Sequence, residues 1–212
     1  MDRSPAARAQ QTAATDVPPD AHSMVFVCTA NQCRSPIAEG LAAREATRRG
    51  LAIRTSSMGL LPGGTAVPAL GQAMASELGL DLAGHLSRRL DLDELRHASL
   101  VLTMTRMHAR EVLATVPGLW PRVFTVKQLA SYALEHPPTA QSSLSVWLGE
   151  ASHNRSRTEL VGSDTSMDVL DPMGRSAETW RKVIAELVYN LNVIFDVCGS
   201  ALAAPPSNPK HL

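Results

Sequence analysis

The chain has 212 residues, of which 44% are hydrophobic, so it is long and apolar enough for one domain with a real core. Its 20 basic and 20 acidic residues balance, which excludes the strong net field expected of a protein that binds nucleic acid or an anionic membrane. The three cysteines are an odd number with two close together, so they favour a reducing cytoplasm over a disulfide framework.

Residues 1–22 lack apolar periodicity, so we expect a disordered N-terminal tail with no secretory signal. A single domain is expected over residues 23–198. Within it, short apolar runs indicate strands at residues 24–27, 51–57, 100–102 and 122–124. Helical apolar spacing and end signals indicate helices at residues 36–49, 67–78, 92–97, 105–116, 126–134, 143–152 and 177–197. The Ala, Pro and Ser of residues 199–212 indicate a disordered C-terminal tail.

This alternation of strands and helices predicts an α/β fold, a three-layer sandwich with a four-stranded parallel sheet and helices on both faces. Ligands of such sheets bind at the carboxyl ends of the strands. The apolar stripe of the expected last helix is interpreted as core packing, and no apolar run is judged long enough to span a bilayer. Residues 153–170 are polar and loop-like, and could be a lid, a partner surface or slack.

The loop after the first strand has the composition of a phosphate cradle. Cys28 and Arg34 are separated by five residues, and Ser35-Pro36 is a pair that opens helices, with Ser35 as the expected N-cap. A loop this short can turn its backbone N–H groups inward, and the helix that follows adds its positive end. The residues expected to bind phosphate are Thr29, Ala30, Asn31, Gln32, Cys33 and Arg34.

The residues of this loop also predict a reaction on the bound phosphate ester. Arg34 can offer a planar charged fork to two phosphate oxygens. The same positive field favours the thiolate form of Cys28, and a thiolate that faces a bound phosphate ester is a nucleophile in line with phosphorus. The alternative is a buried structural cysteine with an unrelated surface arginine, which the preceding strand and the Arg-Ser-Pro helix start make the weaker interpretation.

At these residues the chain resembles the low-molecular-weight protein tyrosine phosphatases, whose first strand is followed by Cys-x4-Cys-Arg-Ser-Pro. A second match is the late stretch Asp171-Pro172-Met173-Gly174, and the resemblance covers about residues 23 to 198. It implies a phosphomonoester hydrolase in which Cys28 forms a phosphocysteine. Asp171 would be the general acid, and then the base for the water that releases phosphate. The implied partners are a phosphotyrosine protein and its tyrosine kinase. The alternative for Asp171 is an ordinary turn aspartate.

The resemblance also assigns supporting roles. Ser57, in the stretch Ser57-Met58-Gly59, is expected to brace Asn31, which suits a left-handed loop position, and Ser35 is a further support of the loop. Asn31 could instead be an ordinary loop residue. His85 could brace the site or be a satisfied structural histidine.

Gln32 and Met173 are the residues expected in the substrate pocket. Relatives carry an aromatic residue at the position of Met173 and often another in the loop at residues 60–65, where this chain has none. Ring stacking on a phosphotyrosine is therefore lost, although phosphotyrosine remains the expected substrate class.

Cys28 and Cys33 are expected to form a redox pair, because a loop that curls around an anion brings its ends together. Cys33 could instead merely fill the loop. Other activities on this scaffold are arsenate reduction, which needs relay cysteines that residues 81–97 do not contain, and phosphate binding without catalysis. Cys198 is interpreted as structural. The histidines show no metal-ligand spacing, so we expect no metal and no cofactor.

Overall fold

The computed structural model describes residues 18, 21–161 and 164–203. In chain order the elements are β1 His22–Cys28, α2 Arg34–Arg48, β2 Ile53–Gly59, α3 Ala69–Glu77, α4 Leu92–His97, β3 Leu100–Thr103, α5 Arg106–Thr115, the 3-10 helix η1 Pro117–Arg122, β4 Val123–Thr125, α6 Val126–Glu135, α7 Leu144–His153, the 3-10 helix η2 Arg157–Leu160 and α8 Ala177–Ala203.

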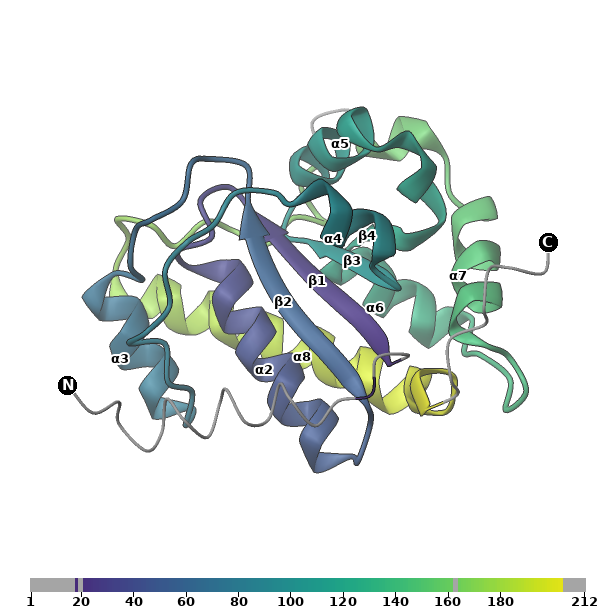
Figure 1. The fold of residues 1–212 in the computed structure, drawn as a ribbon, viewed down its shortest axis with the longest axis horizontal. Helices are drawn as coiled ribbons and strands as arrows, with labels where there is room; N and C mark the ends of the chain where they lie inside the picture. The colour runs from purple at the N-terminus through teal and green to yellow at the C-terminus, as the bar shows by residue number, and fades with distance from the viewer. Residues whose placement is uncertain (1–17, 19–20, 162–163, 204–212) are drawn as a thin grey trace.

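The strands form one parallel sheet in the order β2-β1-β3-β4 (Figure 1). β1 lies inside it, with Phe26 opposite Ser57 on β2 and opposite Leu102 on β3. The expected α/β fold with a four-stranded parallel sheet and helices on both faces is therefore confirmed. Because all strands run in one direction, their carboxyl ends meet at one edge, and the loop after Cys28 lies at that edge.

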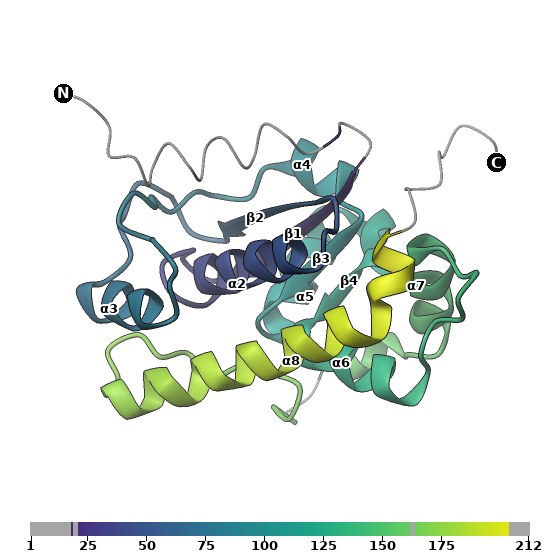
Figure 2. The ribbon, with the colours of Figure 1, turned by 90° about the horizontal axis from the view of Figure 1, so that it is seen from below.

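Alternate side chains of β1 enter two separate cores, as the pleat of a strand requires. Met24 and Phe26 belong to the core that α2, α6 and α8 cover, whereas Val25 and Val27 belong to the core that α4 and α5 cover. Figure 2 shows α2 and α8 on one side of the sheet and α4 on the other. Burial on both faces explains why β1 reads as a continuous apolar run.

The expected domain boundaries need two corrections. His22, which was assigned to the N-terminal tail of residues 1–22, is buried and is the first residue of β1. The helix expected at residues 177–197 continues to Ala203, so residues 199–203 are helical and are not part of a disordered tail. The reason is packing, because Ala201 and Leu202 are buried and extend the apolar stripe of α8. Residues 1–17, 19–20 and 204–212 lie outside the described residues.

Helix α8 is long and apolar enough for a membrane span by length and composition alone. Its large apolar side chains, Trp180, Leu187, Leu191 and Phe195, are buried in the core shared with α2 and α6. They therefore serve as the core packing that the sequence indicated.

Of two expected helix caps, one is present and the other is not. Thr105 caps α5 as expected, since its hydroxyl accepts a hydrogen bond from the backbone N of His108 at 3.3 Å. Ser35 was expected to be the N-cap of α2, and this was wrong. The helix begins at Arg34, the N-cap position is Cys33, and no side chain caps it. The Ser35 hydroxyl turns instead toward the loop after β1. The polar stretch of residues 153–170 also contains η2, where a loop was expected.

Candidate active site

The loop of residues 29–33 links the carboxyl end of β1 to the start of α2 and curls around a sulfur atom. Cys28, the last residue of β1, is only 2% exposed. Its Sγ accepts a hydrogen bond from the backbone N of Asn31 at 3.2 Å and lies 3.0 Å from Ser35 Oγ. A backbone N–H aimed at the thiol is the inward-facing arrangement that an anion-binding loop needs.

Arg34 and Asp171, the other two residues expected to be catalytic, form an ion pair. Its side chain is 4% exposed, and its Nη2 lies 2.6 Å from Oδ2 of Asp171, whose side chain is 47% exposed. Nη1 donates to the carbonyl of Val169 at 3.0 Å, and Nη2 also approaches Thr29 Oγ1 at 3.4 Å. Nε is buried and has no hydrogen-bond partner in the part of the chain that the structure describes. The guanidinium is therefore held by Thr29, Val169 and Asp171, and its Nε donor is still to be satisfied.

Asn31 holds the loop in its curled form. Its φ of 53° places it in the left-handed region, and it is fully buried. Its Nδ2 donates to Ser57 Oγ at 2.7 Å and to Ser35 Oγ at 3.0 Å, while its Oδ1 accepts from the backbone N of Arg88 at 2.9 Å. The Asn31 carbonyl pairs with His85 Nε2 at 2.8 Å. The structure therefore brings all the expected supports, and His85 with them, to one loop residue.

Two carboxylates that the sequence did not indicate, Glu39 and Glu94, bind the residues that hold Asn31. Ser57 Oγ donates to Glu39 Oε2 at 2.6 Å, and burial raises the pKa of Glu39. Arg88, whose backbone binds Asn31, forms an ion pair with Glu94 at 2.6 Å, and this hydrogen-bonded arginine lowers the pKa of Glu94. Glu39 lies one helical turn after Ser35, so only its position on α2 could have indicated it.

His108 is a second residue that sequence reasoning missed. It is fully buried at the start of α5, with Nε2 2.9 Å from Thr29 Oγ1 and Nδ1 2.8 Å from Thr105 Oγ1. Burial, reinforced by the positive charge of Arg34, lowers the pKa of His108 to about 3. A neutral imidazole therefore connects the α5 cap to the first loop residue, and the only signal for it was its place three residues after the capping Thr105.

Cys33 lies at the other end of the loop, and both it and Cys28 are buried free thiols. Burial raises the pKa of Cys33 to about 12, with smaller contributions in the same direction from the negative charges of Asp171 and Cys28.

Three exposed aliphatic residues, Leu61, Leu86 and Met173, belong to segments that contact the loop. Met173, whose backbone N donates to Asp171 Oδ1 at 3.1 Å, is 43% exposed. Leu61, whose backbone N binds the carbonyl of Thr29, is 49% exposed, and Leu86, next to His85, is 63% exposed. Gln32 is partly exposed. These residues could form the walls of a substrate site, but without the ring that stacking requires.

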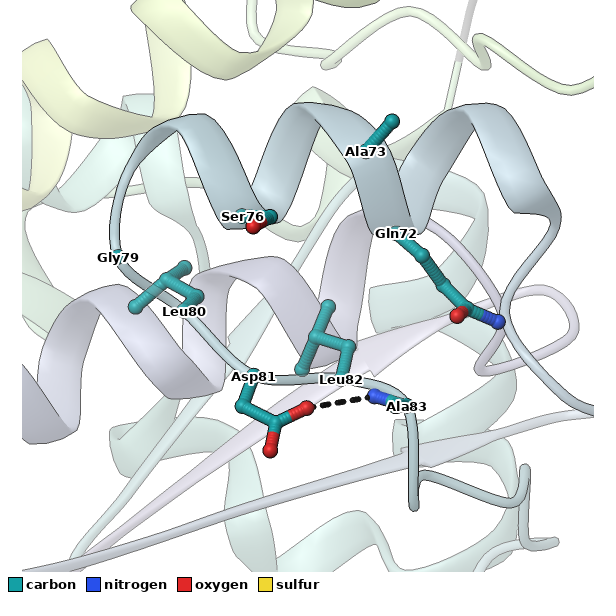
Figure 3. Close-up of a pocket in the computed structure, with 8 residues that line it drawn as sticks. All are labelled: Gln72, Ala73, Ser76, Gly79, Leu80, Asp81, Leu82 and Ala83. Carbon is teal, nitrogen blue, oxygen red and sulfur yellow. Dashed lines mark hydrogen bonds between the residues drawn. The ribbon is translucent and has the colours of Figure 1, made fainter. Parts of the chain in front are cut away.

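A cavity of about 500 Å³ lies elsewhere, between α3 and the residues that follow it (Figure 3). Its walls include Gln72, Ser76 and Asp81, and Asp81 is already bonded to the backbone N of Ala83 at 3.0 Å. None of the predicted site residues lines this cavity. Among the residues that the structure describes, no group of three or more His, Cys, Asp or Glu side chains is placed to hold a metal ion.

A parallel α/β sheet, with a thiol and an arginine at the two ends of a helix-opening loop at its carboxyl edge, defines the class of low-molecular-weight cysteine phosphatases. The sequence model described as low molecular weight phosphotyrosine protein phosphatase matches residues 23–137. The chain belongs to this family.

Its relatives carry more than one specificity. The chain is 30% identical to a protein-arginine-phosphatase of Bacillus subtilis over 168 residues, which cover 77% of this chain and 88% of that protein. It is 30% identical to a probable low molecular weight protein-tyrosine-phosphatase of Ralstonia solanacearum over 115 residues, 54% of this chain and 77% of that protein. The low molecular weight protein tyrosine phosphatase structure from T. tengcongensis superposes with a TM-score of 0.62 at 26% identity, covering 83% of this chain and 99% of that chain.

The tight contact between β2 and the loop yields a prediction about Gly59. A Cβ at Gly59 would lie 2.8 Å from the backbone N of Asn31 and 2.9 Å from the backbone C of Ala30. Because these are backbone atoms, Gly59→Ala should displace the loop and destabilise the fold by about 1–3 kcal/mol. It should also weaken the binding of inorganic phosphate, measured by calorimetry beside urea unfolding.

Gly149 on α7 is the matched control, because a Cβ there meets nothing within 4 Å. Gly149→Ala should stabilise the helix by about 0.5–1 kcal/mol and leave phosphate binding unchanged. Unchanged phosphate binding in Gly59→Ala would contradict the claim that this contact shapes the loop.

Proposed function

We propose that this chain is a cytoplasmic phosphomonoester hydrolase of phosphoproteins that works through a phosphocysteine intermediate. The observation that carries the proposal is the meeting of three groups at one loop: the Cys28 thiol, the buried Arg34 guanidinium and the Asp171 carboxyl. Arg34 is paired to Asp171 at 2.6 Å, and its buried Nε–H has no hydrogen-bond partner among the residues that the structure describes. An oxyanion in the loop would accept that hydrogen bond, together with those of the inward-facing backbone N–H groups.

The first chemical step uses the sulfur as nucleophile. Sγ of Cys28 accepts the backbone N–H of Asn31 and lies beside the Ser35 hydroxyl, and as the thiolate it attacks phosphorus opposite the leaving oxygen. Once phosphate draws part of the Arg34 fork away, the Asp171 carboxylate takes up a proton from solvent, and it gives this proton to the leaving oxygen as the P–S bond forms and the P–O bond breaks. Arg34 turns part of its fork from Asp171 to the phosphate oxygens, which frees the carboxyl for this transfer.

The second step returns the thiol. Asp171, now ionised, takes a proton from a water molecule that attacks the phosphocysteine. The P–S bond breaks, inorganic phosphate leaves and Asp171 is protonated again. Binding phosphate, forming the intermediate and releasing it therefore all use the same loop, with Thr29, Ala30, Gln32 and Cys33 contributing backbone donors.

Phosphotyrosine on a protein is the proposed substrate, with a tyrosine kinase as the enzyme that supplies it, because the family description and the Ralstonia relative both name tyrosine. A second candidate is phosphoarginine, for which a P–N bond would break and Asp171 would protonate the leaving guanidine nitrogen, because the Bacillus subtilis relative is a protein-arginine-phosphatase and matches over 88% of its length. The aliphatic Leu61, Leu86 and Met173 would suit the methylene chain of arginine, whereas they give a tyrosine ring no stacking partner.

The proposal is tested by comparing wild type with Cys28→Ser and Arg34→Ala. Wild type should hydrolyse a phosphotyrosine peptide or a phosphoarginine peptide, and the ratio of the two kcat/KM values identifies the substrate class. Cys28→Ser should lose turnover but still bind vanadate, because the loop and Arg34 remain. Arg34→Ala should lose both. Turnover that survives in Cys28→Ser, or thiol-dependent arsenate reduction without phosphate ester hydrolysis, would contradict the proposed mechanism.

Removing the proposed acid should affect substrates unequally. Asp171→Asn should lower kcat/KM on a phosphotyrosine peptide by roughly 10²–10⁴, the usual contribution of general acid catalysis. The loss should shrink for aryl phosphates whose leaving group needs no proton. A series of substituted phenyl phosphates measures this dependence, and an equal loss across the series would show that Asp171 is not the acid.

We also propose that Cys28 and Cys33 form a reversible redox pair. Hydrogen peroxide would oxidise the Cys28 thiolate to a sulfenic acid with release of hydroxide, and the Cys33 thiol would condense with it, releasing water and forming a disulfide. Wild type should therefore regain activity with dithiothreitol, while Cys33→Ser should recover poorly. Because the pKa of Cys33 is raised to about 12, its thiolate fraction and the condensation rate should increase as the pH rises.

Mass spectrometry of the Cys28–Cys33 peptide follows this disulfide directly, and bound phosphate should slow its formation by covering Cys28. Equal recovery of wild type and Cys33→Ser, with no such peptide, would assign Cys33 to loop packing alone.

A further inference from the structure

The segment of residues 164–173, which carries Asp171, is partly exposed and is attached to the domain through Asp168, Val169 and Asp171. Asp164, Leu170 and Met173 are exposed, whereas Val169 is 1% exposed and Asp168 is partly buried. Asp168 Oδ1 accepts a hydrogen bond from the backbone N of Arg106 at 2.7 Å and lies 3.4 Å from Arg106 Nε. The side chains of this ion pair are 19% and 10% exposed.

Arg106, the partner of Asp168, is fixed in position by α5 and by a further hydrogen bond of its side chain. It is the first residue of α5, so its backbone N–H has no partner inside the helix. The Asp168 carboxylate satisfies this donor and lies where the helix dipole favours a negative charge. Arg106 Nη1 also donates to the carbonyl of Glu159 at 3.2 Å, which ties η2 to the same point.

The next residue continues the attachment toward the catalytic groups. The backbone N of Val169 donates to the carbonyl of Met104, just after β3, at 2.7 Å. The Val169 carbonyl accepts from Arg34 Nη1 at 3.0 Å. Asp171 then follows two residues later, and its backbone is restricted because Pro172 comes next. The path from Asp168 to the Asp171 carboxyl is therefore short and leaves little freedom.

We infer that Asp168 is a positioning residue for the proposed general acid. Asp168 anchors the segment of residues 164–173 to the N-terminus of α5, so that the Asp171 carboxyl is held at Arg34, beside the loop. Asp168 touches neither the thiol nor the phosphate site and acts through Asp171. The inference rests on the proposed phosphatase function, and it adds Arg106 as the partner through which α5 supports catalysis.

Loss of the anchor should slow only the step that needs the acid. Asp168→Ala should lower kcat/KM by roughly 10²-fold on aryl phosphates with poor leaving groups, the scale of a small misplacement of a catalytic group. Its effect should be much smaller for leaving groups that depart without a proton. Asp168→Asn keeps an oxygen acceptor for the Arg106 backbone N–H but loses the charge, so its loss should be intermediate. Inhibition by inorganic phosphate should stay near the wild-type value in both variants.

A double-mutant cycle separates positioning from general damage. In the Asp171→Asn background, Asp168→Ala should cause no further loss, because the group it positions is gone. Asp164→Asn is the matched control, since Asp164 is an exposed carboxylate of the same segment that accepts hydrogen bonds from the backbone N and the hydroxyl of Ser166. It should behave as wild type on all substrates. Urea unfolding of each variant measures any loss of stability, and Asp168→Asn replaces Asp168→Ala in the cycle if the alanine variant fails to fold.

The outcomes are distinct. A loss in Asp168→Ala that is equal for all leaving groups, or that adds fully to the loss in Asp171→Asn, would overturn the positioning role, as would wild-type activity. If wild type has no phosphatase activity, or keeps it in Cys28→Ser, the proposed function fails instead, whatever Asp168 does.

Discussion

The conformation of the loop after β1 depends on one buried carboxamide, that of Asn31. A non-glycine residue with a φ of 53° is held in a conformation that costs about 1–3 kcal/mol when the surroundings do not favour it. Here the side chain donates to Ser35 and Ser57 and accepts from Arg88, while its carbonyl meets His85. These contacts offset the strain and fix the turn that aims the Asn31 N–H at Cys28.

A second constraint is the charge of Arg34, which is buried beside a thiol. A buried cation is costly without a partner, and the Asp171 carboxylate supplies one at 2.6 Å. In the proposed reaction an incoming phosphate is a competing partner for the same fork. The exchange lets phosphate binding release the Asp171 carboxyl, so that the acid becomes available when a substrate is in place.

The groups around the loop come from several carboxyl strand ends. Ser57 stands near the end of β2, Cys28 ends β1, and Met104 and Thr105 follow β3. These residues hold the loop and the segment that carries Asp171. Ser57 binds Asn31, the Met104 carbonyl binds the backbone N of Val169, and Thr105 is linked to Thr29 through His108. A parallel sheet makes this convergence possible because its carboxyl ends lie along one edge.

The sequence by itself determined the elements of the sheet and the local part of the site. Apolar runs located the strands, and the short spacing from Cys28 to Arg34 indicated the anion loop, because neighbours in sequence are constrained to be neighbours in space. Only the tertiary structure decided that Ser35 faces the thiol instead of capping α2, that α8 continues to Ala203, and that His108 meets Thr29. Contacts such as Arg106 with Asp168 join residues 62 positions apart. Local pattern carries no signal for such pairs, since chain folding and burial bring them together.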